Sequence, residues 1–224
     1  GGLCTLLEQA SAIEGLDRIR FLTSNPFDMT EDMMRRFGQT PKVMPWLHIP
    51  AQSGSDVVLE RMKRTYTVAQ YEEVVGWARA HIPGVEITSD FIVGFSGETD
   101  DDFEGTRSLV ERMDFVQSYV FKYSVRPRTL SARRLPDDVP ESVKQARNAA
   151  LHEVQGRNSE RRNAAMIGRE VEVLVDGVSK NRDDMLSGRE PGNRLVHFPG
   201  DASLAGQLVN VTITANGKHS LVGE

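Results

Sequence analysis

The chain has 224 residues with a net charge of -5, and this length suits one large domain or two small ones with a sizeable core. The mildly acidic balance argues against a protein coated in basic surface, while it leaves room for a local basic patch. The single cysteine, Cys4, excludes a disulfide framework and any cysteine-ligated metal or iron–sulfur site completed by this chain, and it fits a reducing cytoplasm.

The first half of the chain alternates strand-like and helix-like segments. Strands are predicted over residues 19–22, 46–49, 87–93 and 118–123. Helices are predicted over residues 3–13 and 30–37. Three more helices are predicted to begin after Ser55 or Asp56, after Thr67 and after Thr99. The connections are long enough for right-handed crossovers, so this α/β rhythm favours a parallel sheet, as part of a barrel or an open sheet. No apolar run is long enough to span a membrane.

The most informative stretch is residues 89–103, a buried strand followed by a glycine loop and a helix start. Gly94 and Gly97 allow a sharp turn or the close approach of a ligand. Thr99 has capping-box spacing to Asp102. Such a loop holds ligands in many α/β enzymes, but an ordinary connection between strand and helix is an equal alternative. Glu98 either accepts hydrogen bonds from a ligand or supports the loop.

A second candidate loop is residues 48–56, at the end of the strand over 46–49. Gln52 and Ser53 supply donors and acceptors beside Gly54, which suits a ribose or a carboxylate. The alternative is a packed His48 and a serine that only caps a helix. Arg64 either clamps a carboxylate through two hydrogen bonds or lies at a solvated helix end.

The pattern changes after Tyr123. Residues 126–140 contain three prolines and several charges and predict an exposed connection, and residues 141–167 predict a long helix. Short strands are then predicted over residues 171–175, 185–189, 195–198 and 207–214, with a last edge from 221, which is typical of a small antiparallel barrel. Its cations either contact a phosphate backbone or belong to a solvated surface, since acids are interleaved with them.

Five motifs, in order, carry a resemblance over essentially the whole chain: LHIPAQSGSD, KRTYT, SDFIVGFSGET, YVFKYSVRPRT and SGREPGNRLVHF. They closely resemble the radical-SAM tRNA methylthiotransferases. The resemblance implies later strands of a radical-SAM partial TIM barrel over residues 1–130, a helical connection over 131–159, and an RNA-binding TRAM β-barrel over 160–224. The chain starts with Gly1 and lacks the three-cysteine cluster motif, so we expect a C-terminal fragment that is inactive alone.

The resemblance implies methylthiolation of carbon 2 of N6-isopentenyladenosine next to the tRNA anticodon. The alternatives are the sister activity on threonylcarbamoyl-adenosine and a non-catalytic tRNA-binding remnant. The implied cofactors are S-adenosyl-L-methionine (SAM) and two 4Fe-4S clusters, whose ligands this chain lacks. The implied partners are the anticodon stem-loop of tRNA and an electron donor for cluster reduction, and we expect a cytoplasmic monomer without membrane contact.

The resemblance also assigns residues, although it assigns no catalytic residue and no metal ligand. The residues implied for SAM are Gln52, Ser53, Ser89, Asp90, Gly94, Glu98 and Tyr123. The residues implied for RNA are Arg64, Lys180, Arg182, Arg189, Asn193 and Arg194. Two positions depart from the family pattern: Ser96 replaces a usual proline, which should loosen the glycine loop, and Arg128 replaces a usual glycine.

Overall fold

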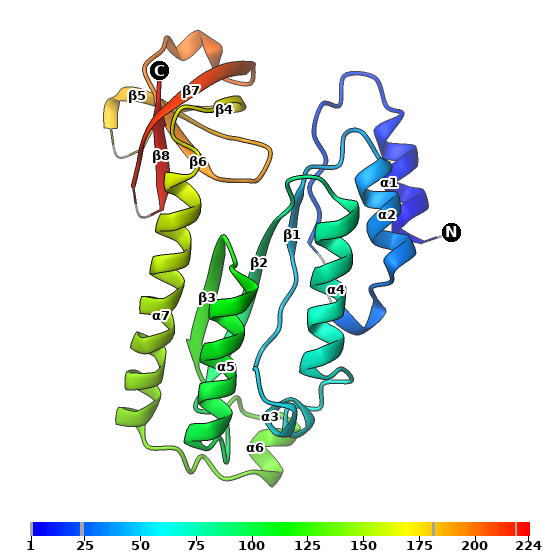
Figure 1. Ribbon diagram of the computed structural model, residues 1–224, viewed down its shortest axis with the longest axis vertical. Helices are drawn as coiled ribbons and strands as arrows, with labels where there is room; N and C mark the ends of the chain where they lie inside the picture. The colour runs from blue at the N-terminus through cyan, green and yellow to red at the C-terminus, as the bar shows by residue number, and fades with distance from the viewer. Residues whose placement is uncertain (1, 23–24, 181, 218) are drawn as a thin grey trace.

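The computed structural model describes residues 2–22, 25–180, 182–217 and 219–224, without the side chains of 182 and 183. Within that part of the chain, a three-stranded sheet is covered by helices on one face, and a closed five-stranded barrel follows it (Figure 1). A long helix, α7 (Glu141–Ala164), runs along the sheet and leads into the barrel. The described helices include none that is both long and apolar enough to cross a membrane.

The sheet is parallel, in the order β1 (Trp46–His48), β2 (Glu86–Val93) and β3 (Gln117–Lys122). These strands confirm three of the four predicted ones. The strand predicted over residues 19–22 is wrong, because Ile19 forms only an isolated bridge with Val43. The partner segment is itself turned there, with the Val43 amide bonded to the Thr40 carbonyl, so the pairing cannot extend.

The helices begin at the predicted caps. The side chains of Thr30, Ser55, Thr67 and Thr99 each accept a hydrogen bond from the first turn of a helix. These helices are α2 (Glu31–Gln39), α3 (Asp56–Arg61), α4 (Val68–His81) and α5 (Asp100–Met113), and α1 (Leu3–Ser11) precedes them. Thr99 and Asp102 form the predicted capping box. The short helices η1 (Pro26–Asp28) and α6 (Leu130–Arg134) complete this half, the latter within the predicted exposed connection.

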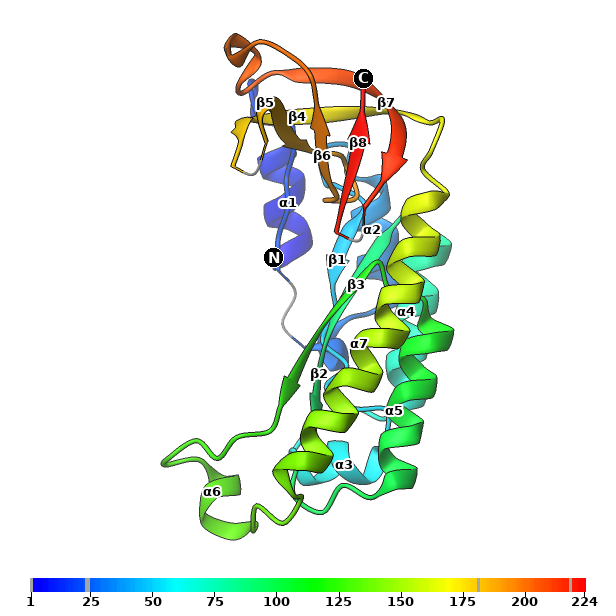
Figure 2. The ribbon, with the colours of Figure 1, turned by 90° about the vertical axis from the view of Figure 1, so that its left-hand side faces the viewer.

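Only one face of the sheet is covered by helices, as Figure 2 shows from the side. The side chains of Leu47, Phe91 and Val120 belong to the buried core on the helix side. The alternate residues Tyr119 and Phe121 are exposed. We call the bare side the open face. By register and alternation, its side chains are those of Trp46, His48, Glu86, Thr88, Asp90, Ile92, Gln117, Tyr119 and Phe121.

The outer edge of β3 is covered by polar side chains of α7. Asn148 donates to the Val120 carbonyl, Gln155 to the Phe115 carbonyl and Ser159 to the Val116 carbonyl. A covered strand edge is a poor template for pairing with another chain. The sheet therefore ends at β3. The apolar residues that α7 buries are Leu151 and Val154, and the other side chains that it buries are polar or charged.

The barrel contains β4 (Glu170–Ser179), β5 (Arg182–Arg189), β6 (Leu195–Phe198), β7 (Leu208–Asn216) and β8 (Ser220–Gly223), with a short helix η2 (Ala202–Leu204). It closes in the order β4-β5-β6-β8-β7 around a separate apolar core. The predicted antiparallel pattern holds except for β6 and β8, which pair in parallel. β6 and β8 are separated in sequence by β7, and no turn motif joins them. Their pairing could therefore not be predicted from the sequence.

Candidate functional site

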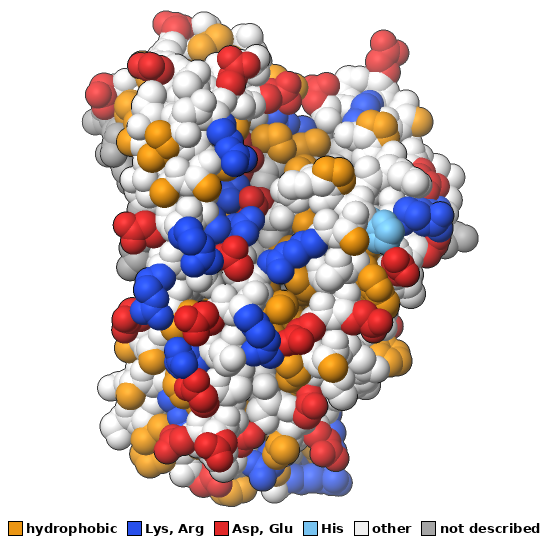
Figure 3. Space-filling view, in the orientation of Figure 1, with side chains coloured by type: hydrophobic (Ala, Val, Ile, Leu, Met, Phe, Trp, Pro, Cys, Tyr) orange, Lys and Arg blue, Asp and Glu red, His pale blue; other side chains and the backbone are white. Residues whose placement is uncertain are grey.

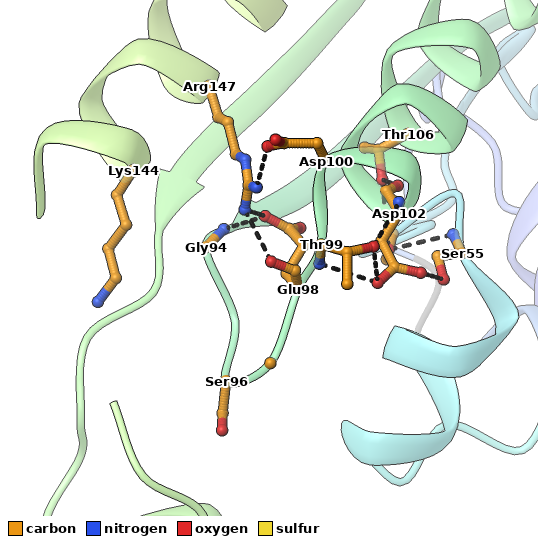
Figure 4. Close-up of polar contacts among 12 residues, drawn as sticks. Ser55, Gly94, Ser96, Glu98, Thr99, Asp100, Asp102, Thr106, Lys144 and Arg147 are labelled. Carbon is orange, nitrogen blue, oxygen red and sulfur yellow. Dashed lines mark hydrogen bonds and ion pairs between the residues drawn. The ribbon is translucent and has the colours of Figure 1, made fainter. Parts of the chain in front are cut away.

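The glycine loop after β2 is held by a buried ion pair (Figure 4). Glu98 Oε2 accepts hydrogen bonds from the Gly94 amide at 2.6 Å and from Arg147 Nη1 at 2.7 Å. Arg147 Nη2 also donates to Asp100 at 2.7 Å. Burial raises the pKa of Glu98, although the Gly94 amide and Arg147 act in the opposite direction. Glu98 thus fixes the loop to α7, and its Oε1 has no partner among the described residues.

Gly94 itself cannot carry a side chain. Its φ is +71°, and a Cβ atom would collide with the stem of Lys144. Lys144 is buried and donates to the Tyr123 carbonyl and to Asp137. At the other end of the loop, Arg61 Nη1 donates to the carbonyls of Ser96 and Gly97.

The loop after β1 is held against α5. The Ser53 hydroxyl lies 3.3 Å from the Thr106 hydroxyl, which also accepts from the Gly54 amide at 2.9 Å. A Cβ atom on Gly54 would collide with the backbone of α5 at Gly105, so the close approach requires glycine. Gln52 is buried in a left-handed conformation with a φ of 68° and bridges β2 through its backbone. Left-handed backbone in a residue other than glycine is common at functional sites.

The neighbours Ser89 and Asp90 lie on opposite faces of the sheet. Ser89 is on the helix side, where its hydroxyl accepts from the Ala51 amide and lies 3.2 Å from the Tyr71 hydroxyl. Asp90 is on the open face, 3.4 Å from His48 Nε2. The structure therefore brings Asp90 together with His48 and separates it from Ser89.

A cavity of about 690 Å³ lies at the carboxyl ends of the strands. Ile92, Phe95, Leu130 and Leu135 give it an apolar lining, and Arg61, Arg64 and Arg134 add cations. Tyr123 packs on Phe95 with ring centroids 4.7 Å apart, and its buried hydroxyl has no partner in the described part of the chain. The sequence does not predict that α6 lines this cavity, because the prolines and charges of residues 126–140 are typical of an exposed connection.

Arg128 has a φ of +72°, a conformation that favours glycine. The glycine that the resemblance leads us to expect at this position would adopt this conformation without strain. We expect Arg128→Gly to raise the free energy of unfolding by about 1 kcal/mol in urea titrations, because relief of strain exceeds the added chain entropy. Arg126→Gly, in the same loop without a positive φ, should bring no gain. If Arg128→Gly lowers the free energy of unfolding as much as Arg126→Gly does, the backbone at Arg128 is not strained.

The barrel residues assigned to RNA differ in exposure. Lys180 is exposed after β4, and the side chain of Arg182 lies outside the described residues. Arg189 is half-buried and donates to the Asn193 carbonyl at 2.8 Å. Arg194 is buried and donates to Glu86 of β2 at 2.7 Å. The structure thus gathers Arg189, Asn193 and Arg194 in one hairpin, which lies at the opposite end of the sheet from α3 (Figure 1). Arg64 is not part of this group and lines the cavity at the carboxyl ends of the strands.

A buried carboxylate that sequence reasoning missed joins the two halves of the molecule. Glu86 Oε2 accepts from Arg162 Nη2 of α7 at 2.6 Å, and its Oε1 accepts from Arg194 of the barrel. Arg18 and Arg20 reach the same hairpin through the carbonyls of residues 189 and 190. Figure 3 shows Lys and Arg side chains gathered where α7 meets the barrel, with acidic side chains among them.

Two family models match the chain. Residues 5–110 match the radical SAM superfamily, and residues 164–224 match the TRAM domain. Curated relatives named tRNA-2-methylthio-N(6)-dimethylallyladenosine synthase are 46% identical in Rhodopirellula baltica, 46% in Moorella thermoacetica and 48% in Anaeromyxobacter dehalogenans. The matches cover 97%, 98% and 100% of this chain but 47%, 49% and 50% of the relatives, so the chain spans about half their length.

A solved structure shares the fold. Coproporphyrinogen III oxidase from Escherichia coli, described as a radical SAM enzyme, matches with a TM-score of 0.50 and 13% sequence identity. The match covers 75% of this chain and 45% of that chain. At this identity the likeness concerns the fold alone.

Proposed function

Because the chain belongs to the radical-SAM tRNA methylthiotransferase family, we propose that it is part of an enzyme that methylthiolates carbon 2 of N6-isopentenyladenosine beside the anticodon of tRNA. The observation that carries this proposal is identity of 46–48% to the named synthases through both halves of the chain. The order of a radical-SAM segment and then a TRAM domain in one chain supports it.

SAM fits the carboxyl-end cavity and its surroundings. The apolar lining near Phe95 suits a nucleoside, and Arg61, Arg64 and Arg134 suit the carboxylate of its methionine part. The unpartnered hydroxyl of Tyr123 is a further group available for hydrogen bonding. Gln52 and Asp90 would bind from the sheet side, while Ser53, Gly94 and Glu98 would hold the two loops in shape. In this family SAM supplies the adenosyl group that abstracts hydrogen.

An iron–sulfur cluster does not fit this chain. Its one cysteine, Cys4, is buried on α1, and the described residues include no group of three side chains suited to a metal ion. The contribution that we propose for these residues is therefore to bind and orient SAM and to hold RNA. Both roles can be measured without the cluster.

The RNA part of the proposal is tested by salt-dependent binding of an anticodon stem-loop RNA. We expect Arg189→Ala to weaken binding and to reduce the slope of log affinity against log salt by about one, because one phosphate contact is lost. Arg107→Ala is the matched control, since Arg107 lies on α5 and pairs with Glu104. A slope that is equal in Arg189→Ala and wild type would contradict an RNA contact at Arg189.

A further inference from the structure

A second cavity, of about 340 Å³, separates the open face of the sheet from the barrel. Trp46, Gln117 and Tyr119 line it from the sheet, and Arg189 and Asn193 line it from the barrel hairpin. Asn163 of α7 closes one side. This cavity lies at the amino ends of the strands, whereas the cavity proposed for SAM lies at their carboxyl ends.

The walls of this cavity are fixed by buried contacts. Arg194 donates to Glu86 at 2.7 Å and to Asn163 Oδ1 at 3.1 Å, which docks the hairpin onto the sheet and α7. Glu190 accepts from the amides of Gly192 and Arg194, which sets the shape of the hairpin tip. The space is thus defined by side chains and backbone that already have partners.

The nearby carboxylates are paired with other groups, which leaves the guanidinium of Arg189 as a cation at the cavity. The carboxylates of Glu86 and Glu190 are engaged with Arg162, Arg194 and backbone amides. In the described structure, the Arg189 guanidinium has one hydrogen bond, from Nη1 to the Asn193 carbonyl. Its remaining donors suit a phosphate oxygen. Trp46 and Tyr119 add two aromatic side chains, and Tyr119 is 45% exposed.

We propose that this cavity binds one unstacked nucleotide of the bound RNA, other than the nucleotide that is modified. The base contacts Trp46 and Tyr119, its edge meets the amide of Gln117, and its phosphate meets Arg189. Aromatic side chains beside a cation are the usual means of holding a single-stranded base. The cavity volume is within the range of small-ligand sites. This inference rests on the proposed function, because it takes RNA as the partner.

The test uses anticodon stem-loop RNAs in which the fluorescent base 2-aminopurine replaces one loop nucleotide at a time. Stacking on an aromatic side chain quenches this base. With the wild-type protein we expect strong quenching at one loop position. Trp46→Ala and Tyr119→Ala should each abolish that quenching and weaken binding about 5- to 150-fold, which is the effect of one base stacked on an aromatic side chain.

Two further variants control for the fold. Trp46→Phe keeps an aromatic ring and should retain the quenching. Phe121→Ala removes an exposed aromatic side chain from the same face outside this cavity, and it should leave the quenching unchanged. Equal quenching in wild type, Trp46→Ala and Tyr119→Ala would overturn the inference while the RNA function stands. A wild-type protein that binds none of these RNAs would overturn the proposed function as well.

Discussion

Glu86→Ala is expected to lower the free energy of unfolding by about 3–5 kcal/mol, a large share of the stability of a domain. Glu86 is 8% exposed and accepts hydrogen bonds from Arg162 and Arg194. The alanine variant leaves the buried guanidinium of Arg194 with only its longer, 3.5 Å ion pair to Glu190, and burial of a poorly paired charge is costly. Urea titrations that follow the barrel and the sheet separately should show that the two halves no longer unfold together.

The controls separate the buried pair from ion pairs in general. Glu86→Gln keeps the shape of the side chain and one acceptor oxygen. Its free energy of unfolding should therefore lie between those of the alanine variant and the wild type. Glu153→Ala removes an exposed pair with Arg157 on α7, and we expect a change below about 0.5 kcal/mol. If Glu86→Ala behaves like Glu153→Ala, the buried carboxylate does not join the two halves.

Arg147→Met should cost about 3–5 kcal/mol, because it leaves Glu98 buried without its cation. The Glu98 side chain is fully buried and Arg147 is nearly so. The same change frees the glycine loop from α7, so SAM binding, measured by calorimetry, should weaken as well. Arg107→Met is the matched control, because it removes a half-buried arginine of α5 that pairs with the exposed Glu104.

The loss in Arg147→Met should depend on pH with a definite sign. Burial raises the pKa of Glu98 above its ordinary value of 4.5, so the folded state binds this proton more tightly than the unfolded chain does. Stability from this group therefore rises as pH falls through the folded pKa, and it levels off below 4.5. Without Arg147 the pKa rises further, which extends the pH window upward. Adding Glu98→Gln to Arg147→Met should remove this pH dependence of stability. If the double variant keeps the pH profile of Arg147→Met, the pH dependence does not come from Glu98.

The sequence predicts what is local in this fold. The caps at Thr67 and Thr99 depend on neighbouring residues and follow from propensity. The left-handed backbone at Gly94 is also a local property, since glycine adopts a positive φ without strain. The face of Ser89 could also have been predicted, because side chains of adjacent strand residues alternate. The carboxyl ends of the strands are likewise a general place for a site in parallel α/β folds.

The missed contacts are distant in sequence. Glu98 and Arg147 are 49 residues apart, and Glu86 and Arg194 are 108 apart. In sequence, Arg147 is one charge among many on a helix with few apolar residues, and this pattern normally indicates a solvated face. Only the packing of α7 on the sheet shows that some of these charges are buried. Arg194, assigned to RNA from the resemblance, has a buried partner within the protein.

The central proposal is tested most directly by nucleoside mass spectrometry of tRNA from cells in which the gene for this protein is deleted. We predict that the 2-methylthio form of N6-isopentenyladenosine disappears and that the form without the methylthio group accumulates. Return of the intact gene should restore the modified nucleoside. An unchanged level of the 2-methylthio nucleoside in the deleted cells, or the loss of the methylthio group from threonylcarbamoyl-adenosine instead, would contradict the proposal.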